Sequence, residues 1–294
     1  MKMKAQYENM IYTIVKYVFG LGVTFFALFP MYWMFTMALK PFAEWSPTRV
    51  HWWPWYPTAL NFLVLFFPKD TLVAWGLVNP GEPLIHDTAT KAILNSLLFS
   101  TVGTAVALFV GTFAAYAMSR YKAGGDYLFL TFRMLPPIAI LMPIVIWFST
   151  LRLMDSPIGM ILLYGLFPVP FVIWLMRSFF DDLPREIDEA ALMDGCSPAM
   201  TFVRVILPLV RGGLAVTALF IFILNWSDLI VALTITQRIS VTIPVQIGLF
   251  ESDAGHMYGI MTALGIVAVI PTLIFGLAIQ KYLVRGLTFG AIKG

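Results

Sequence analysis

The chain has 294 residues, of which 60% are hydrophobic and only 12% are charged, and its mean hydropathy is +0.84. Soluble domains carry about 25% charged residues, so this composition excludes a soluble globular protein and indicates an integral membrane protein. The net charge of +3 is too small for a nucleic-acid-binding surface, and the single cysteine, Cys196, excludes an intrachain disulfide.

Six apolar stretches are long enough to cross a bilayer as helices, each of which needs about 20 apolar residues. Strands of a membrane barrel would instead be about 10 residues long with an alternating pattern. The sequence therefore predicts an all-α membrane protein with six transmembrane helices, at about 14–39, 91–118, 127–150, 158–180, 212–235 and 257–284. We expect the first helix to be retained, because it is longer than the core of about 7–15 residues of a secretory signal and no small-x-small cleavage site precedes Lys40.

Positive residues set the expected orientation, because Lys and Arg concentrate in cytoplasmic loops. Six spans place both termini, the loop 119–126 and the hairpin 181–211 on one side of the membrane. That side holds twelve of the 19 Lys and Arg residues: Lys2, Lys4, Lys16, Arg120, Lys122, Arg177, Arg185, Arg204, Arg211, Lys281, Arg285 and Lys293. The other side holds six: Lys40, Arg49, Lys69, Lys91, Arg152 and Arg238, with Arg133 inside the third span. We therefore expect the N- and C-termini to be cytoplasmic.

Residues 40–90 form the longest segment outside the spans, and they contain a Trp- and Pro-rich run from His51 to Pro57. Trp and Tyr favour the headgroup level of a bilayer, so one interpretation is an interfacial segment. The alternative is a cap over the outer mouth or a contact with an external partner.

Small residues and prolines mark several of the spans. Gly103, Gly111, Ala114 and Ala115 recur at small-residue spacing in the second span, which suits close packing within the bundle or against a second membrane subunit. Prolines such as Pro168 and Pro271 interrupt other spans, and each predicts either a static kink or a broken helix along a transport path.

The hairpin 181–211 is a charged segment between two apolar spans, so it must face water or another protein. We call it the charged hairpin; it holds six of the 16 acids. Pro184 and the acids that follow it predict a helix start, Asp194-Gly195 predicts a stop, and Ser197-Pro198 predicts the capped start of a second helix that ends near Pro208.

The order Glu189-Ala190-Ala191, Gly195 and Val205-Ile206-Leu207-Pro208 resembles the EAA loop of ABC-importer permeases, with Val205 where the family usually has Ile. Three further stretches are similar to permeases of the maltose-transporter type: Asn95-Ser96, Ala115 to Arg120, and Asn225-Trp226-Ser227-Asp228. The ending Arg285 to Gly294 is also similar. The likeness covers about residues 87–294 well and the first span loosely, whereas residues 45–85 depart from it.

This resemblance implies a type I ABC importer transmembrane domain in a bacterial inner membrane. The implied parts are an N-terminal helix and outer loop at 1–86, a core permease domain at 87–284 with the EAA coupling loop at 181–211, and a cytoplasmic tail at 285–294. The tail either approaches the ATPase subunits or is a frayed end. The implied partners are a second permease subunit, two ATPase subunits, an extracytoplasmic solute-binding protein and the surrounding lipid.

In such importers the EAA loop is where an ATPase subunit holds the permease. The residues implied to couple to the ATPase are Glu186, Glu189, Ala190, Ala191, Asp194 and Gly195. The alternative is an ordinary loop that only caps the bundle. The implied solute is carbohydrate-like, namely a sugar, a polyol, glycerol or glycerol phosphate.

Polar side chains in the fifth span are candidates for the solute path. Asn225 and Asp228 supply hydrogen-bonding groups and Trp226 supplies a ring, which is the chemistry that recognises sugars and polyols. The alternative is a structural role, with the solute contacts in the other permease.

The sequence gives no sign of catalysis within this chain. The dipeptide Gly-Lys of the phosphate-binding loop is absent, so ATP and Mg²⁺ are expected on partner subunits and this chain needs no cofactor. His51, His86 and His256 are spaced unlike metal ligands. An ion-coupled secondary transporter is the competing class, but Asp228 and Arg133 are the only clear candidates for ion coupling.

Overall fold

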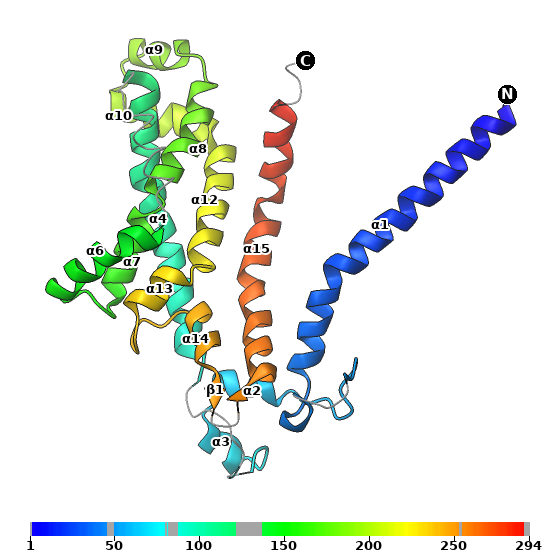
Figure 1. Ribbon diagram of the computed structural model, residues 1–294. Helices are drawn as coiled ribbons and strands as arrows, with labels where there is room; N and C mark the ends of the chain where they lie inside the picture. The colour runs from blue at the N-terminus through cyan, green and yellow to red at the C-terminus, as the bar shows by residue number, and fades with distance from the viewer. Residues whose placement is uncertain are drawn as a thin grey trace. The chain divides into compact units, whose positions relative to one another are not determined.

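The computed structural model of the chain describes residues 2–45, 50–79, 81, 88–121, 137–252 and 255–290. Its secondary structure is almost entirely helical (Figure 1). The chain divides into two compact units, one of Met1–Ala89 with Ile247–Val267 and one of Thr90–Gln246 with Ala268–Gly294. The boundaries predicted at residues 86 and 284 stay predictions, and Ile247–Val267 groups with the N-terminal unit.

The first unit begins with the long helix α1 (Lys2–Ala38), whose C-terminal end is closed by side chains. Asn61 Nδ2 donates to the carbonyls of Ala38 and Lys40 at 2.8 Å each, and Trp45 Nε1 also donates to the Lys40 carbonyl, at 2.9 Å. These bonds satisfy carbonyls that a helix end leaves without a partner. The unit continues with η1 (Phe42–Glu44), α2 (Leu60–Phe66), α3 (Lys69–Ala74) and the antiparallel strands β1 (Glu251–Ser252) and β2 (Gly255–His256).

The Trp- and Pro-rich segment folds back onto the last turns of α1. The Trp52 ring lies 6.0 Å from the Phe29 ring and 5.8 Å from the Trp33 ring, and Lys40 Nζ donates to the His51 carbonyl at 2.7 Å. The rings of Trp53 and Trp55 remain exposed. Exposed aromatic rings beside the end of an apolar helix suit the interfacial interpretation of this segment.

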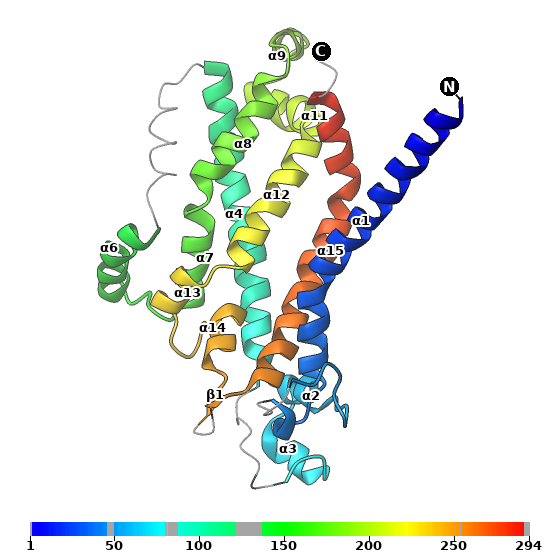
Figure 2. The ribbon, with the colours of Figure 1, turned by 45° about the vertical axis from the view of Figure 1, so that its right-hand side comes forward.

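The second unit is built on α4 (Thr90–Tyr121), which packs against α7 (Pro157–Leu166), α8 (Val169–Asp181) and α12 (Arg211–Trp226) (Figures 1 and 2). The short helix α9 (Glu186–Met193) lies across one end of α4 and α8. It leads into α10 (Pro198–Met200), the π-helical η2 (Thr201–Ile206) and α11 (Leu207–Leu209). The unit also contains α6 (Pro137–Thr150) and α13 (Ile230–Ile235), whereas α14 (Ile243–Leu249) and α15 (Tyr258–Gly290) have residues in both units.

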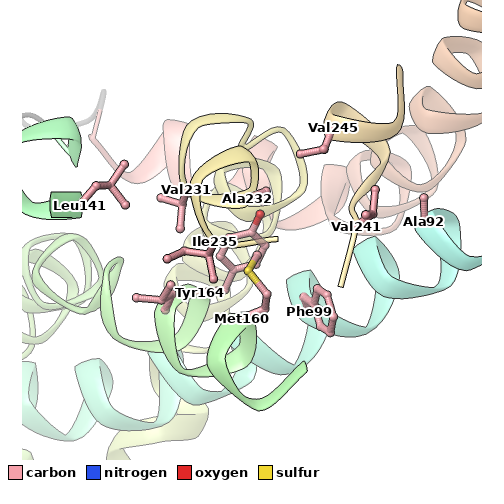
Figure 3. Close-up of a cluster of buried hydrophobic side chains, with 11 residues drawn as sticks. Ala92, Phe99, Leu141, Met160, Tyr164, Val231, Ala232, Ile235, Val241 and Val245 are labelled. Carbon is pink, nitrogen blue, oxygen red and sulfur yellow. The ribbon is translucent and has the colours of Figure 1, made fainter. Parts of the chain in front are cut away.

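Glycines let α4 approach its neighbours closely. A Cβ atom on Gly103 would lie 2.6 Å from Tyr164 Cβ, and one on Gly111 would lie 2.6 Å from Val172 Cβ. Such distances leave no room for a methyl group, so the small residues of this helix serve packing within the chain. Two apolar cores follow. One is around Phe99, Met160 and Tyr164 (Figure 3), and the other joins Phe180 of α8 to Phe202 and Ile206 of the charged hairpin.

Four helical segments within the described residues are long and apolar enough to cross a membrane: Tyr12–Ala38, Thr90–Tyr121, Pro157–Asp181 and Tyr258–Gln280. They correspond to the first, second, fourth and sixth predicted spans. The pair Pro198–Leu209 and Arg211–Trp226, bent by 80°, makes a fifth if it is counted as one span. The third predicted span is described only from Pro137, so its first part, including Arg133, lies outside the described residues.

The prediction of one continuous fifth span at 212–235 was wrong. Helix α12 ends at Trp226, and the separate helix α13 begins at Ile230. The reason is Asp228, whose carboxylate accepts the backbone amide of Ala232 at 3.1 Å and that of Val231 at 3.5 Å. A side chain that takes these amides starts a new helix and competes with continuation of the old one.

The loop after α13 is held by side chains from two other elements. The carboxylate of Asp155 accepts the four consecutive backbone amides of residues 237–240 at 2.9–3.1 Å, and Asn95 Nδ2 donates to the carbonyls of Ile239 and Val241 at 2.9 Å. Burial alone would raise the pKa of Asp155, but these amide bonds together outweigh it and lower that pKa below its ordinary value.

Candidate functional site

The charged hairpin has the local structure that its sequence predicts. Helix α9 carries Glu186, Asp188 and Glu189 in its first turn, where the positive end of the helix favours negative charge. Gly195 follows it with a φ of +86°, in the left-handed region that favours glycine. Ser197 Oγ accepts the amide of Met200 at 3.3 Å, and Pro198 occupies the first turn of α10. Pro184 differs slightly from the expectation, because it precedes α9 and its carbonyl accepts the amide of Ile187.

A buried ion pair fastens α9 to the end of α4. Arg120 Nε lies 2.9 Å from Asp188 Oδ2, and the two side chains are only 8% and 12% exposed. The Tyr116 hydroxyl donates to Asp188 Oδ1 at 2.5 Å. We call Tyr116, Arg120 and Asp188 the hairpin anchor. A buried charge without its partner is costly, so these contacts hold the hairpin in one orientation.

Further bonds tie the anchor to α8 and to the start of the hairpin. Arg120 Nη1 donates to the carbonyl of Phe180 at 3.1 Å and to that of Leu183 at 3.4 Å. Ser119 Oγ donates to Asp181 Oδ1 at 2.5 Å, and Arg185 Nη2 donates to the Ser119 carbonyl at 3.0 Å. The end of α4 is therefore bonded to both α8 and α9. Rotation of the hairpin would have to break these bonds or move the helices with it.

The hairpin anchor was not predicted from the sequence. The stretch from Ala115 to Arg120 stood out only as a point of family likeness, and Asp188 only as one of several acids near a helix start. A usable signal was present: a Tyr and an Arg four residues apart lie on one helical face, beside the hairpin in a six-span topology.

The outward face of the hairpin carries five of the six residues predicted to couple to an ATPase. Glu186, Glu189, Ala190, Asp194 and Gly195 are exposed, whereas Ala191 is buried against the bundle. Among them stand the exposed apolar side chains of Leu192 and Met193, the latter 88% exposed. An exposed face that mixes acids and large apolar groups is typical of a contact surface.

The residues predicted for the solute path have polar groups that are already bonded within the chain. Asn225 is 5% exposed, and its Nδ2 atom donates to the Tyr164 carbonyl at 3.0 Å. The Asp228 carboxylate accepts the Tyr164 hydroxyl at 3.1 Å. Trp226 Nε1 instead donates to the Ala268 carbonyl at 2.9 Å. The structure thus brings Asn225 and Asp228 together around Tyr164 and leaves Trp226 apart, and solute contact by these three stays a prediction.

Comparison with known proteins places this arrangement in a family. Residues 103–289 match the family model "Binding-protein-dependent transport system inner membrane component". The chain belongs to this family. The match contains the charged hairpin and the hairpin anchor, so the hairpin is part of a permease component of ABC importers.

Curated relatives agree over almost the whole chain. The trehalose transport system permease protein SugB of Mycobacterium tuberculosis is 32% identical over 276 residues, which cover 92% of this chain and 93% of the relative. The trehalose/maltose transport system permease protein MalG of Thermococcus litoralis is 30% identical over 293 residues, which cover 98% and 99%.

A solved structure agrees in fold. It belongs to a bacterial ABC transporter involved in the import of the acidic polysaccharide alginate, with a TM-score of 0.73 and 20% identity over 94% of this chain and 97% of that chain. The predicted all-α permease fold and the predicted ABC-importer family are therefore confirmed. The competing class, an ion-coupled secondary transporter, gives way to the family assignment.

Proposed function

We propose that this permease imports a carbohydrate-like solute as one of two membrane subunits, with two ATPase subunits and an extracytoplasmic solute-binding protein. Support for the solute class comes from the relatives, whose names refer to trehalose and maltose. A sugar, a polyol, glycerol or glycerol phosphate fits this class. ATP and Mg²⁺ would bind to the ATPase subunits, and both termini of this chain would face the cytoplasm.

The observation that carries the proposal is the charged hairpin with its anchor. A coupling element has to be exposed to its partner on one face and fixed to the membrane helices on the other. Glu186, Glu189 and Met193 supply the exposed face, and the Arg120–Asp188 pair fixes the opposite face. Movement of an ATPase subunit against this face would then displace α8 and α12 together with the hairpin. This displacement would switch the bundle between two states.

Within the hairpin, Glu189 is proposed to meet basic groups of the ATPase, with Glu186, Ala190 and Asp194 around it. Gly195 is proposed to keep the corner tight, and Ala191 to pack the helix against the bundle. Asn225, Trp226 and Asp228 fit a structural role better than a solute-binding one, because their polar groups are bonded to Tyr164, Ala232 and Ala268.

The test is to purify the chain from membranes with the subunits that accompany it and to reconstitute the complex in vesicles. ATP hydrolysis is measured with trehalose, maltose, glycerol and glycerol 3-phosphate in turn, with the solute-binding protein present. We expect one of these solutes to stimulate hydrolysis and to accumulate in vesicles supplied with ATP. Accumulation driven by an ion gradient, in vesicles that lack the ATPase subunits, would contradict the proposal.

A further inference from the structure

Pro168 creates a gap in the hydrogen bonding of the fourth span. In a continuous helix the amide of residue 168 would donate to the carbonyl of Tyr164, but proline has no N–H. The segment Phe167–Pro168 accordingly separates α7 from α8. A buried carbonyl without a donor costs free energy, and more so in a membrane, where no water can replace the missing donor.

Asn225 fills this gap from another helix. Its Nδ2 atom donates to the Tyr164 carbonyl at 3.0 Å and reaches Thr104 Oγ1 on α4 at 3.4 Å. The side chain of Tyr164 is buried in the core that Figure 3 shows, and its hydroxyl donates to Asp228 at 3.1 Å. Asp228 in turn marks the break between α12 and α13. We call Thr104, Tyr164, Asn225 and Asp228 the polar junction, and it joins the two helix breaks.

The polar junction lies at the far ends of the two helices that flank the charged hairpin. Helix α8 has 13 residues and runs about 20 Å from the Pro168 break to the hairpin. Helix α12 has 16 residues and runs about 24 Å from the hairpin to Asn225 and Trp226. The hairpin joins these helices at one end. At the other end, the bond from Asn225 joins α12 to Tyr164, which lies on α7 just before the Pro168 break.

We propose that Asn225 is a positioning residue that makes α7 move together with α12 when the charged hairpin is displaced. Without its amide, the break at Pro168 absorbs the displacement before it reaches α7. ATP hydrolysis then continues while less solute is moved for each ATP. This inference rests on the proposed function, because it assigns Asn225 to the coupling step of that transport cycle.

The experiment compares Asn225→Leu, Pro168→Ala and the double variant in vesicles, and it measures uptake and ATP hydrolysis in the same sample. Leu has the branched shape of Asn and the same number of side-chain heavy atoms but no donor, so we expect solute moved per ATP to fall about five- to tenfold, as for the loss of one buried hydrogen bond. The solute concentration for half-maximal uptake should not change. Pro168→Ala restores a main-chain N–H that can donate to the Tyr164 carbonyl and so join α7 to α8 across the break. Displacement of α8 would then reach α7 directly, and the double variant should recover most of the lost uptake per ATP.

Ser227→Ala is the matched control. The Ser227 hydroxyl belongs to the same polar stretch, but it donates at 2.7 Å to the carbonyl of Ile223, four residues earlier in the chain. Its removal should therefore leave uptake per ATP at the wild-type level. The proposal is overturned if the double variant transports no better than Asn225→Leu. It is also overturned if Asn225→Leu raises the half-saturating solute concentration and leaves uptake per ATP unchanged, which is the result for a solute contact.

The rescue keeps the test decisive even if Asn225→Leu does not assemble. In that case the double variant should restore both assembly and uptake, and its failure to do so counts against the proposal. Wild-type vesicles report on the proposed function separately: if they show no ATP-dependent uptake, the importer assignment fails before Asn225 is tested.

Discussion

Single residues decide how tightly the second unit packs. Gly103 and Gly111 face Tyr164 and Val172 at distances that exclude a Cβ atom, whereas a Cβ on Gly212 would meet nothing within 4 Å. Glycine in a helix is otherwise unfavourable, because it loses more backbone entropy than alanine on folding. The same substitution should therefore have opposite effects at these positions.

We predict that Gly103→Ala lowers the thermal unfolding midpoint of the purified complex. Forcing a methyl group into a packed site costs about 1–3 kcal/mol, because α4 and α7 have to move apart. Gly212→Ala should leave the midpoint unchanged or raise it slightly. Differential scanning fluorimetry of both variants in detergent measures the effect, and equal midpoints for the two would contradict the packing described for Gly103.

Asp155 should make the loop at 237–240 sensitive to pH. Its pKa is lowered, so the carboxylate is ionised and its stabilisation is complete above the ordinary carboxyl range, at about pH 4 and higher. The stabilisation is lost as the pH falls through the lowered pKa. Asp155→Asn removes the charge and turns an NH₂ group toward amide donors, so the loop should be loose at every pH.

Hydrogen exchange of the amides at 237–240 measures this effect. We expect protection in the wild type at pH 7 that disappears in strong acid, and little protection in Asp155→Asn at either pH. The neighbouring amide of Ile243, which donates to Ser96 Oγ at 2.7 Å, provides an internal reference. Full protection of residues 237–240 in the variant at pH 7 would show that Asp155 does not hold the loop.

At the scale of elements, the hairpin anchor should behave as a coupled pair. Asp188→Leu leaves Arg120 buried without its partner, which costs about 3–5 kcal/mol, whereas the double variant Arg120→Leu with Asp188→Leu removes both charges and should cost less than the sum of the single changes. Thermal unfolding of the wild type, both single variants and the double variant forms the thermodynamic cycle. Additive losses would mean that the 2.9 Å pair contributes nothing as a pair.

Local signals in the sequence predicted some elements well and missed others. Gly195 and Ser197 determine the shape of the charged hairpin through backbone preferences, which are readable without the fold. The break at Asp228 was missed, because the apolar residues on both sides of it mimic one continuous span. The hairpin anchor was missed because only the packing of α4 against α9 brings its residues together. The bond from Asn225 to Tyr164 was missed because it depends in the same way on the packing of α7 against α12.

At the scale of the whole molecule, the EAA-like order of residues identified the family before any geometry was known. Composition limited the chain to a helical membrane protein, but it could not show which polar residues face a partner and which are used internally. Asp188 and Glu189 illustrate the difference: the two acids are neighbours in the chain, yet one is paired with Arg120 inside the bundle and the other is exposed.

Site-specific photocross-linking from residue 193 of the assembled complex tests the role of the charged hairpin most directly. Met193 lies on the exposed face of α9, and Phe109, whose side chain is also exposed on the apolar helix α4, serves as the control position. If the hairpin is the coupling element, a photoreactive residue at 193 captures an ATPase subunit, the one at 109 does not, and Glu189→Ala reduces both the capture and ATP-dependent uptake. If residue 193 captures no ATPase subunit and Glu189→Ala shows normal uptake, the result contradicts that role.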